Sequence, residues 1–259
     1  VLMVGTPSAD FAYLRRVIEA DSNVVSDVIS PDTPQGGGFR SGAALEDLGR
    51  YALVVLHNVP AALLTPEIQR ELVSTVTSGG GLLVVGGDES LNAGWGTGLS
   101  SVLPTESAGA ANYVSGAYSA RIPAGAERHS ILRLSEDPVA EREAWSALPP
   151  FFGMSMQQVS KAATSSVLLE NEEGDPLVAV RNAGRGKCAV VGARGFARAG
   201  LMMWGIGDTD RVVRSFWQKT IRWLLTKEEV RKLRITTEKQ TYRSGEPVSF
   251  RAELFDDLL

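Results

Sequence analysis

The chain has 259 residues, of which 44% are hydrophobic and 22% charged, and its formal net charge is −4. This length suits one large α/β domain, or a domain of about 200 residues with a small attachment. The negative charge and the scattered basic residues exclude the electrostatic footprint of a nucleic-acid-binding protein. One cysteine, Cys188, and two histidines, His57 and His129, exclude an internal disulfide framework and a multi-cysteine metal site. We therefore expect no metal, no cofactor and no nucleic-acid partner.

Hydropathy along the chain gives no run of the roughly 18 apolar residues that cross a membrane, and no signal peptide. The sequence begins with Val1 inside an apolar run and ends at Leu259, shortly after an acidic pair. We expect it to be a segment of a longer protein, so this segment does not decide whether that protein has a membrane anchor elsewhere.

The first part of the chain alternates between predicted strands and helices. Ser8 is a suitable N-cap for a helix after the first strand, and Thr65 with Pro66 marks the start of a second helix. Such alternation is typical of a parallel sheet with helices on both faces. Apolar runs predict strands over residues 1–5, 24–29, 51–56 and 82–85.

The middle of the chain is less regular, and clear patterns return after residue 165. Residues 91–112 form a Gly-, Ser- and Ala-rich excursion, and residues 131–134 are predicted as a short strand. The Gly-Arg-Gly segment 184–186 predicts a hairpin turn. Strands are predicted over 165–169, 177–181 and 187–193, and an amphipathic helix over 209–225.

The tail has a different pattern. Apolar runs at 233–237 and 248–254 predict two strands around a turn at 242–247. This pair resembles the opening hairpin of an Ig-like β-sandwich. We therefore predict two domains, an α/β domain over residues 1–228 and the start of a truncated Ig-like domain over 229–259.

The most informative segment is residues 79–90, which read GGGLLVVGGDES. An apolar strand runs into a tight glycine turn, and in α/β folds of this kind such a turn often presents a catalytic Cys or Ser. Here the turn, the elbow, is Gly86-Gly87-Asp88, followed by Glu89 and Ser90. The framework of a hydrolase-like domain is therefore present without an obvious nucleophile.

Five segments stand in order along the chain: DFAYLRR at 10–16, GGGLLVVGG at 79–87, LP at 103–104, GRGK at 184–187 and FWQKTIRWL at 216–224. Together they resemble a class I glutamine amidotransferase-like domain, in particular the one found in large bacterial membrane-anchored proteins. The resemblance covers residues 1–225 and implies a flavodoxin-like parallel sheet flanked by helices. It also implies a following Ig-like module and a location on the extracytoplasmic side of a bacterial membrane, with the cytoplasm as the alternative.

The same resemblance gives the expected function. Active members of the wider amidotransferase superfamily carry a Cys at the elbow, with a His and a Glu later in the chain. This sequence has Gly87 at the elbow and no late His-x-Glu pair. We therefore predict a catalytically silent amidotransferase-like module that serves binding or assembly, with other domains of its parent protein or separate proteins as partners.

An enzyme is the first alternative. In it a hydrolase or amidotransferase uses relocated residues at the carboxyl edge of the sheet, with His57, Asp88, Glu89 and Ser90 as the candidates. Cys188 lies in the middle of a predicted strand, where a buried structural thiol is expected rather than a nucleophile.

A binding domain for a small ligand or sugar is the second alternative. The loops 91–112 and 195–207 would form its site, because each contains a tryptophan in a glycine-rich context. The predicted ligand-binding residues are Gly86, Gly87, Asp88, Trp95 and Trp204.

Overall fold

The computed structural model describes residues 1–30, 47–92, 94–107, 113–134, 137–205, 209–226, 233–237 and 250–254. The chain divides into two compact units, Val1–Lys227 and Glu228–Leu259. In the second unit, strands β12 (Leu233–Thr237) and β13 (Phe250–Leu254) form an antiparallel pair. Their assignment to an Ig-like domain stays a prediction, and the predicted turn at 242–247 lies outside the described residues.

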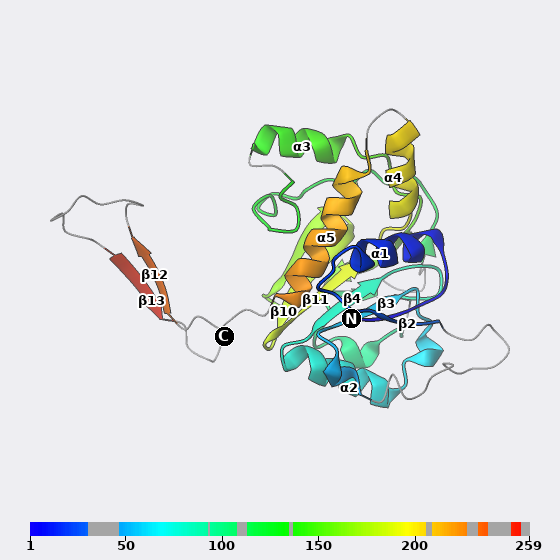
Figure 1. The fold of residues 1–259 in the computed structure, drawn as a ribbon, viewed down its shortest axis with the longest axis vertical. Coiled ribbons are helices and arrows are strands. Elements are labelled where there is room, and N and C mark those ends of the chain that lie inside the picture. The colour runs from blue at the N-terminus through cyan, green and yellow to red at the C-terminus, as the bar shows by residue number, and fades with distance from the viewer. Residues whose placement is uncertain are drawn as a thin grey trace. The chain divides into compact units, whose positions relative to one another are not determined.

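A seven-stranded mixed sheet with the order β2-β1-β3-β4-β11-β10-β9 organises the first unit (Figure 1). The five strands from β2 to β11 run parallel, whereas β10 is antiparallel to both of its neighbours. The strands are β1 (Leu2–Gly5), β2 (Asp27–Ile29), β3 (Leu53–His57), β4 (Gly81–Val85), β9 (Ser165–Glu170), β10 (Pro176–Ala183) and β11 (Gly186–Val191).

Helices and short strand pairs complete the described part of this unit. The helices are α1 (Ala9–Glu19), α2 (Pro66–Thr77), α3 (Pro138–Ser146), α4 (Phe196–Gly205) and α5 (Arg211–Leu225). The short pairs are β5 (Thr105–Ser107) with β8 (Gln157–Val159), and β6 (Tyr113–Val114) with β7 (Met154–Ser155). None of the helices in these ranges is long and apolar enough to cross a membrane.

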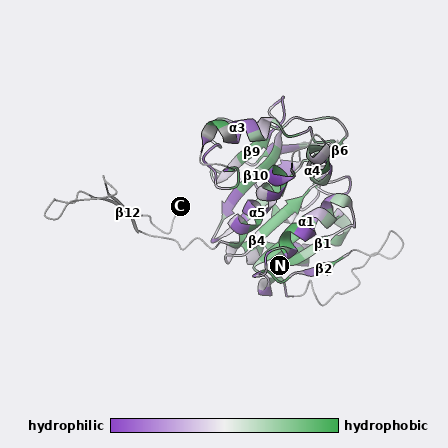
Figure 2. Ribbon diagram, turned by 45° about the horizontal axis from the view of Figure 1, so that its top comes forward, coloured by the Kyte–Doolittle hydropathy of each residue, from purple (hydrophilic) through white to green (hydrophobic). Residues whose placement is uncertain are grey.

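The sheet separates two hydrophobic clusters. Met3 and Val55 pack on the face covered by α1, α4 and α5, whereas Leu2 and Val54, one residue earlier, pack on the face covered by α2. This alternation is the period of two expected of a strand, and both faces are apolar because helices cover both. Figure 2 shows hydrophobic strands at the centre and helices with both hydrophobic and hydrophilic parts.

The parallel strands end level with one another. Gly5 of β1 pairs with His57 of β3, His57 pairs with Val85 of β4, and Val85 pairs with Val191 of β11. The loops that follow these four strands therefore meet at one edge of the sheet. In open α/β sheets this carboxyl edge is where ligands bind.

The predicted helix caps form as expected. The Ser8 hydroxyl accepts a hydrogen bond from the Phe11 N–H at 3.1 Å, and the Thr65 hydroxyl accepts one from the Ile68 N–H at 3.4 Å. Each satisfies one of the backbone donors that the first turn of a helix leaves unpaired.

A long-range cap joins α1 to α4. The Asp10 carboxylate accepts hydrogen bonds from the N–H groups of Gly195 and Ala197, both at 2.8 Å. These donors lie at the start of α4, where unpaired N–H groups and the helix dipole favour a negative charge. Asp10 therefore fixes the chain after β11 against the start of α1.

Three sequence predictions need correction. The sheet is mixed rather than parallel, because hairpins connect β9, β10 and β11 and reverse the direction of β10. Residues 131–134 are not a strand, because Ile131 and Leu132 lie in turns and bury their side chains in the core. The segment 195–207 is not a loop over its described residues, because α4 occupies 196–205.

Replacing Asp10 with Ala is expected to lower the free energy of unfolding by about 1–2 kcal/mol, because two N–H groups at the start of α4 lose their acceptor. Urea denaturation measures this loss. The matched control is Glu19→Ala on the same helix, which removes an exposed ion pair with Arg15 at 2.7 Å. This control should lower the free energy of unfolding by roughly 0.2–0.5 kcal/mol. Equal losses in the two variants would contradict the capping role of Asp10.

Candidate functional site

A small polar pocket lies at the carboxyl edge of the parallel strands. Its volume is about 180 Å³. The loops after β1, β3, β4 and β11 all contribute to it. The lining residues are Thr6, Pro7, Ser8, His57, Asn58, Gly86, Gly87, Asp88, Glu89 and Arg194. The pocket thus contains the elbow and three of the four catalytic candidates predicted from the sequence.

The elbow has no room for a side chain. A Cβ atom built on Gly87 would lie 2.3 Å from Oδ1 of Asn58, and one built on Gly86 would lie 2.6 Å from Oγ of Ser155. Both separations are far below van der Waals contact. The space that a nucleophilic side chain at Gly87 would need is therefore filled by Asn58.

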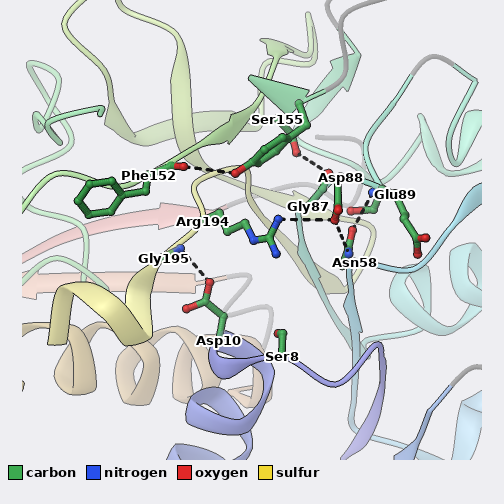
Figure 3. Close-up of polar contacts among 12 residues, drawn as sticks. Ser8, Asp10, Asn58, Gly87, Asp88, Glu89, Phe152, Ser155, Arg194 and Gly195 are labelled. Carbon is green, nitrogen blue, oxygen red and sulfur yellow. Dashed lines mark hydrogen bonds and ion pairs between the residues drawn. The ribbon is translucent and has the colours of Figure 1, made fainter. Parts of the chain in front are cut away.

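Asn58 connects the end of β3 to the elbow (Figure 3). Its backbone has a φ of 48°, in the left-handed region that asparagine tolerates better than most residues. The Asn58 Nδ2 group donates to Oδ1 of Asp88 at 2.9 Å, and Asn58 Oδ1 accepts from the N–H of Glu89 at 2.9 Å. One side chain therefore orders the whole turn from residue 87 to 89.

Asp88 and Arg194 form a loose ion pair across the pocket. Nη1 of Arg194 lies 3.6 Å from Oδ1 of Asp88, and the two side chains are 41% and 60% exposed. The Arg194 guanidinium also lies over the ring of Tyr113, 5.6 Å from its centroid. Pairs this exposed contribute little to stability, so Arg194 can exchange Asp88 for another anion at small cost.

His57 is buried beneath this pocket. Its side chain is 5% exposed and meets the ring of Phe11 edge-on, with centroids 5.4 Å apart. Within the part of the chain that the structure describes, neither imidazole nitrogen has a hydrogen-bond partner. Burial lowers the pKa of His57 to about 4, the carboxylate of Asp10 opposes this shift, and Arg194 reinforces it. The imidazole is therefore neutral at pH 7.

The catalytic candidates do not join into a proton-transfer chain. Ser90 is fully buried, and its Oγ lies 3.5 Å from the carbonyl oxygen of Val85. Among the described residues, no hydrogen bond or ion pair connects His57 with Asp88, Glu89 or Ser90. The relocated machinery predicted as an alternative is therefore not assembled in this structure.

Cys188 lies in β11, fully buried, and burial raises the pKa of its thiol. This agrees with the structural role expected from its position in a strand.

His129 packs edge-on against Trp223, with ring centroids 5.5 Å apart. The described residues contain no group of three or more His, Cys, Asp or Glu side chains that could hold a metal ion.

The two tryptophans proposed to line a ligand site are separated. Trp95 is buried, donates from Nε1 to the carbonyl oxygen of Val59 at 2.6 Å, and lines a second pocket of about 380 Å³. Trp204 is 63% exposed on α4 and is not part of that lining. The structure thus does not form the single pocket rimmed by both tryptophans.

The sequence analysis did not identify Asn58 and Arg194 as site residues, nor the contact of Asp10 that fixes the loop carrying Arg194. Asn58 follows a predicted strand, and an asparagine at a strand end is a signal for a left-handed turn. Arg194 follows the predicted strand 187–193, so its place at the carboxyl edge could have been inferred. The partners of Asp10 lie about 185 residues away in the chain, and no local pattern predicts such a contact.

Comparison with known proteins identifies the fold. No family model matches the sequence, and no curated protein does. The structure is similar to the cytoplasmic protein STM1381 of Salmonella typhimurium LT2, with a TM-score of 0.63 and 20% identity over 86% of this chain and 98% of that one. The cytoplasmic protein STM3548 of Salmonella typhimurium gives 0.61 and 17% over the same shares.

A ThuA-like protein from Parabacteroides merdae also shares the fold, with a TM-score of 0.55 and 14% identity over 87% of this chain and 89% of that one. Identities this low show the fold alone. The class of protein defined by these similarities is an α/β domain with a mixed sheet flanked by helices.

The pH dependence of stability tests the neutral state of His57. Its folded-state pKa of about 4 lies below the ordinary value of 6.5. Between these two pH values His57 is protonated in the unfolded chain but neutral in the folded protein. The contribution of neutral His57 to the free energy of unfolding is fully present above pH 6.5 and is lost as the pH falls toward 4. Between pH 7.5 and 5 the loss should be about 2 kcal/mol.

Urea denaturation at a series of pH values measures this loss, and His57→Leu should remove most of it. A parallel series with His129→Leu gives the share of the second histidine, whose pKa burial also lowers. An unchanged pH dependence in His57→Leu would show that the imidazole is not buried in its neutral form.

The packing of Asn58 against the elbow gives a separate prediction. Gly87→Ala should lower the free energy of unfolding by about 1–3 kcal/mol, because the new methyl group overlaps the Asn58 amide. Gly49→Ala is the matched control, since its Cβ would meet no atom closer than 4.0 Å. Adding Asn58→Gly should relieve part of the loss, so the double variant should be more stable than the sum of the single effects. Strict additivity would contradict the contact.

Proposed function

We propose that this chain is a catalytically silent amidotransferase-like module that serves binding or assembly within a larger protein. The observation that carries the proposal is the filled elbow, where the Asn58 amide occupies the space next to Gly87. A nucleophile at that position is required for the acyl transfer of active amidotransferases. The α/β fold that the chain shares with a ThuA-like protein is compatible with the proposal.

The polar groups of the pocket support binding rather than turnover. A general base works best when its pKa is near the working pH and when it reaches the proton that it removes. His57 has a pKa of about 4, and its imidazole has no hydrogen-bond partner among the described residues. Asp88 is held by Asn58 and Arg194. These groups can donate and accept hydrogen bonds to a ligand but do not form a nucleophile–base pair.

The parent protein and its compartment belong to the same proposal. The resemblance to domains of membrane-anchored bacterial proteins suggests other domains of the parent protein as partners. Two similar structures are of proteins named as cytoplasmic, which favours the cytoplasmic alternative over the extracytoplasmic location. Fractionation of cells that express the full-length parent protein distinguishes the two compartments.

Ammonia release from glutamine tests the silent-module proposal. The purified protein is expected to give no turnover above the buffer rate. Gly87→Cys is also expected to be inactive, because its thiol would collide with Asn58 and would have no partner base. Glutamine turnover by the unchanged protein that His57→Leu or Ser90→Ala abolishes would overturn the proposal in favour of relocated catalytic residues.

A further inference from the structure

The outward face of α4 exposes a cluster of large hydrophobic side chains, the α4 patch. Leu201 is 71% exposed, Trp204 63% and Met202 38%. Leu201 and Trp204 are three positions apart, so they lie on the same side of the helix. Single exposed hydrophobic side chains are normal on a protein, whereas a contiguous patch marks an interaction site. The other exposed large hydrophobic side chains of the described ranges lie apart from the patch in the sequence: Val25, Val139 and Val159.

The composition of α4 differs from that of the helices beside it. Helices α1 and α5, which pack against α4 (Figure 1), carry arginines on their exposed sides, among them Arg16, Arg211 and Arg214. Arg198 is the one charged residue of α4. A helix that is apolar nearly all round is expected to be covered on all sides. The described part of the chain covers one side of α4 and leaves the patch exposed.

Two arginines flank the patch. Arg198 lies one turn before it on α4, and its guanidinium stacks on the ring of Phe152, 3.7 Å from the centroid. Arg211 begins α5 next to Asp210, whose Cβ lies 3.2 Å from a Cβ atom built on Gly200 of α4. Both arginines are exposed, and neither forms an ion pair with a described residue. Stacking leaves the N–H groups at the guanidinium edge free to bind an anion.

Two carboxylates lie close to α4, and both already have partners. Asp10 accepts hydrogen bonds from two backbone N–H groups at the start of α4. Asp210 accepts a hydrogen bond from the Tyr13 hydroxyl at 2.8 Å and pairs with Arg214 at 2.5 Å. The two flanking arginines therefore keep their charge for an external partner. Their charge complements an anionic surface.

The size and shape of the patch favour a lipid surface over a protein. Specific protein interfaces bury about 800 Å² and roughly 20–30 residues on each partner, with close shape complementarity. The α4 patch has three large side chains on the convex side of a helix. A bilayer needs no matching shape, because apolar and tryptophan side chains enter the boundary between headgroups and acyl chains. Arginines beside them bind anionic headgroups.

We propose that α4 docks on an anionic bilayer surface. The side chains of the α4 patch enter the headgroup region, and Arg198 and Arg211 bind lipid phosphates. The contact is peripheral and reversible, because three side chains and two charges give far less binding free energy than a membrane-spanning helix. The proposal goes beyond the silent-module function, since none of these side chains lines the pocket at the elbow.

Vesicle binding followed by tryptophan fluorescence tests the proposal. The probes are vesicles of equal parts phosphatidylglycerol and phosphatidylcholine, and vesicles of phosphatidylcholine alone. Trp95, Trp145 and Trp217 are buried, so a shift of the emission to shorter wavelength reports mainly Trp204. Cosedimentation should give a binding constant for the anionic vesicles at least tenfold above that for the neutral ones. Added sodium chloride should weaken the binding, because it screens the arginines.

Trp204→Ser should weaken binding to the anionic vesicles at least tenfold and remove the emission shift. The matched control is Val25→Ser, which removes an exposed apolar side chain far from α4 in the sequence and should leave binding unchanged. Arg211→Gln should weaken binding about fivefold. Its control is Arg222→Gln near the other end of α5, which should bind as the unchanged protein does. All four side chains are exposed, so an unchanged urea midpoint confirms that each variant folds.

Several results would overturn the lipid contact. They are the absence of binding to anionic vesicles, equal binding to neutral vesicles, and binding that Trp204→Ser does not weaken. A benzophenone amino acid placed at position 201 in cells should cross-link to phospholipid. A cross-link to another protein or to a second copy of this chain instead would assign the patch to a protein contact. Glutamine turnover is a separate readout, so loss of the lipid contact with no turnover leaves the silent-module function intact.

Discussion

The contact between Asn58 and Gly87 is the constraint on which the edge of the sheet depends. Two parallel strands end level, and the residue after β3 turns left-handed so that its amide enters the space next to the elbow. That amide then holds both Asp88 and the N–H of Glu89. Because Gly87 has no side chain, the turn packs against Asn58 instead of presenting a group of its own. The elbow therefore offers no side chain of its own to the pocket at this edge.

Asp10 complements this contact from the other side of the pocket. It spans from α1 to the start of α4 and thereby fixes the loop that carries Arg194. Asn58 orders the β4 side of the pocket, and Asp10 orders the β11 side. Both act through hydrogen bonds to backbone N–H groups, which hold main chain in place more firmly than pairs of exposed side chains do. Neither contact holds the Arg194 side chain, whose ion pair with Asp88 is loose and exposed.

The sequence predicted the strands of the sheet well because each is a short apolar run next to a recognisable cap or turn. Ser8, Thr65 and Gly184 act locally, so their positions in the sequence were enough. Helix α4 was missed because FARAGLMMWG is apolar nearly all round and has no clear polar face. The filled elbow could not be predicted, because it depends on a packing contact between residues 29 positions apart. The sequence shows that position 87 carries no thiol, but it does not show that Asn58 fills the space there.

The burial of His57 keeps its imidazole from taking part in proton transfer near pH 7. A histidine that must exchange protons near pH 7 needs water or a charged partner to keep its pKa close to that value. His57 has Phe11 on one side, and among the described residues its nitrogens have no carboxylate partner and no contact with solvent. The fold therefore keeps the imidazole neutral and able to donate one hydrogen bond and accept another. An imidazole in this state does not act as a general base near pH 7.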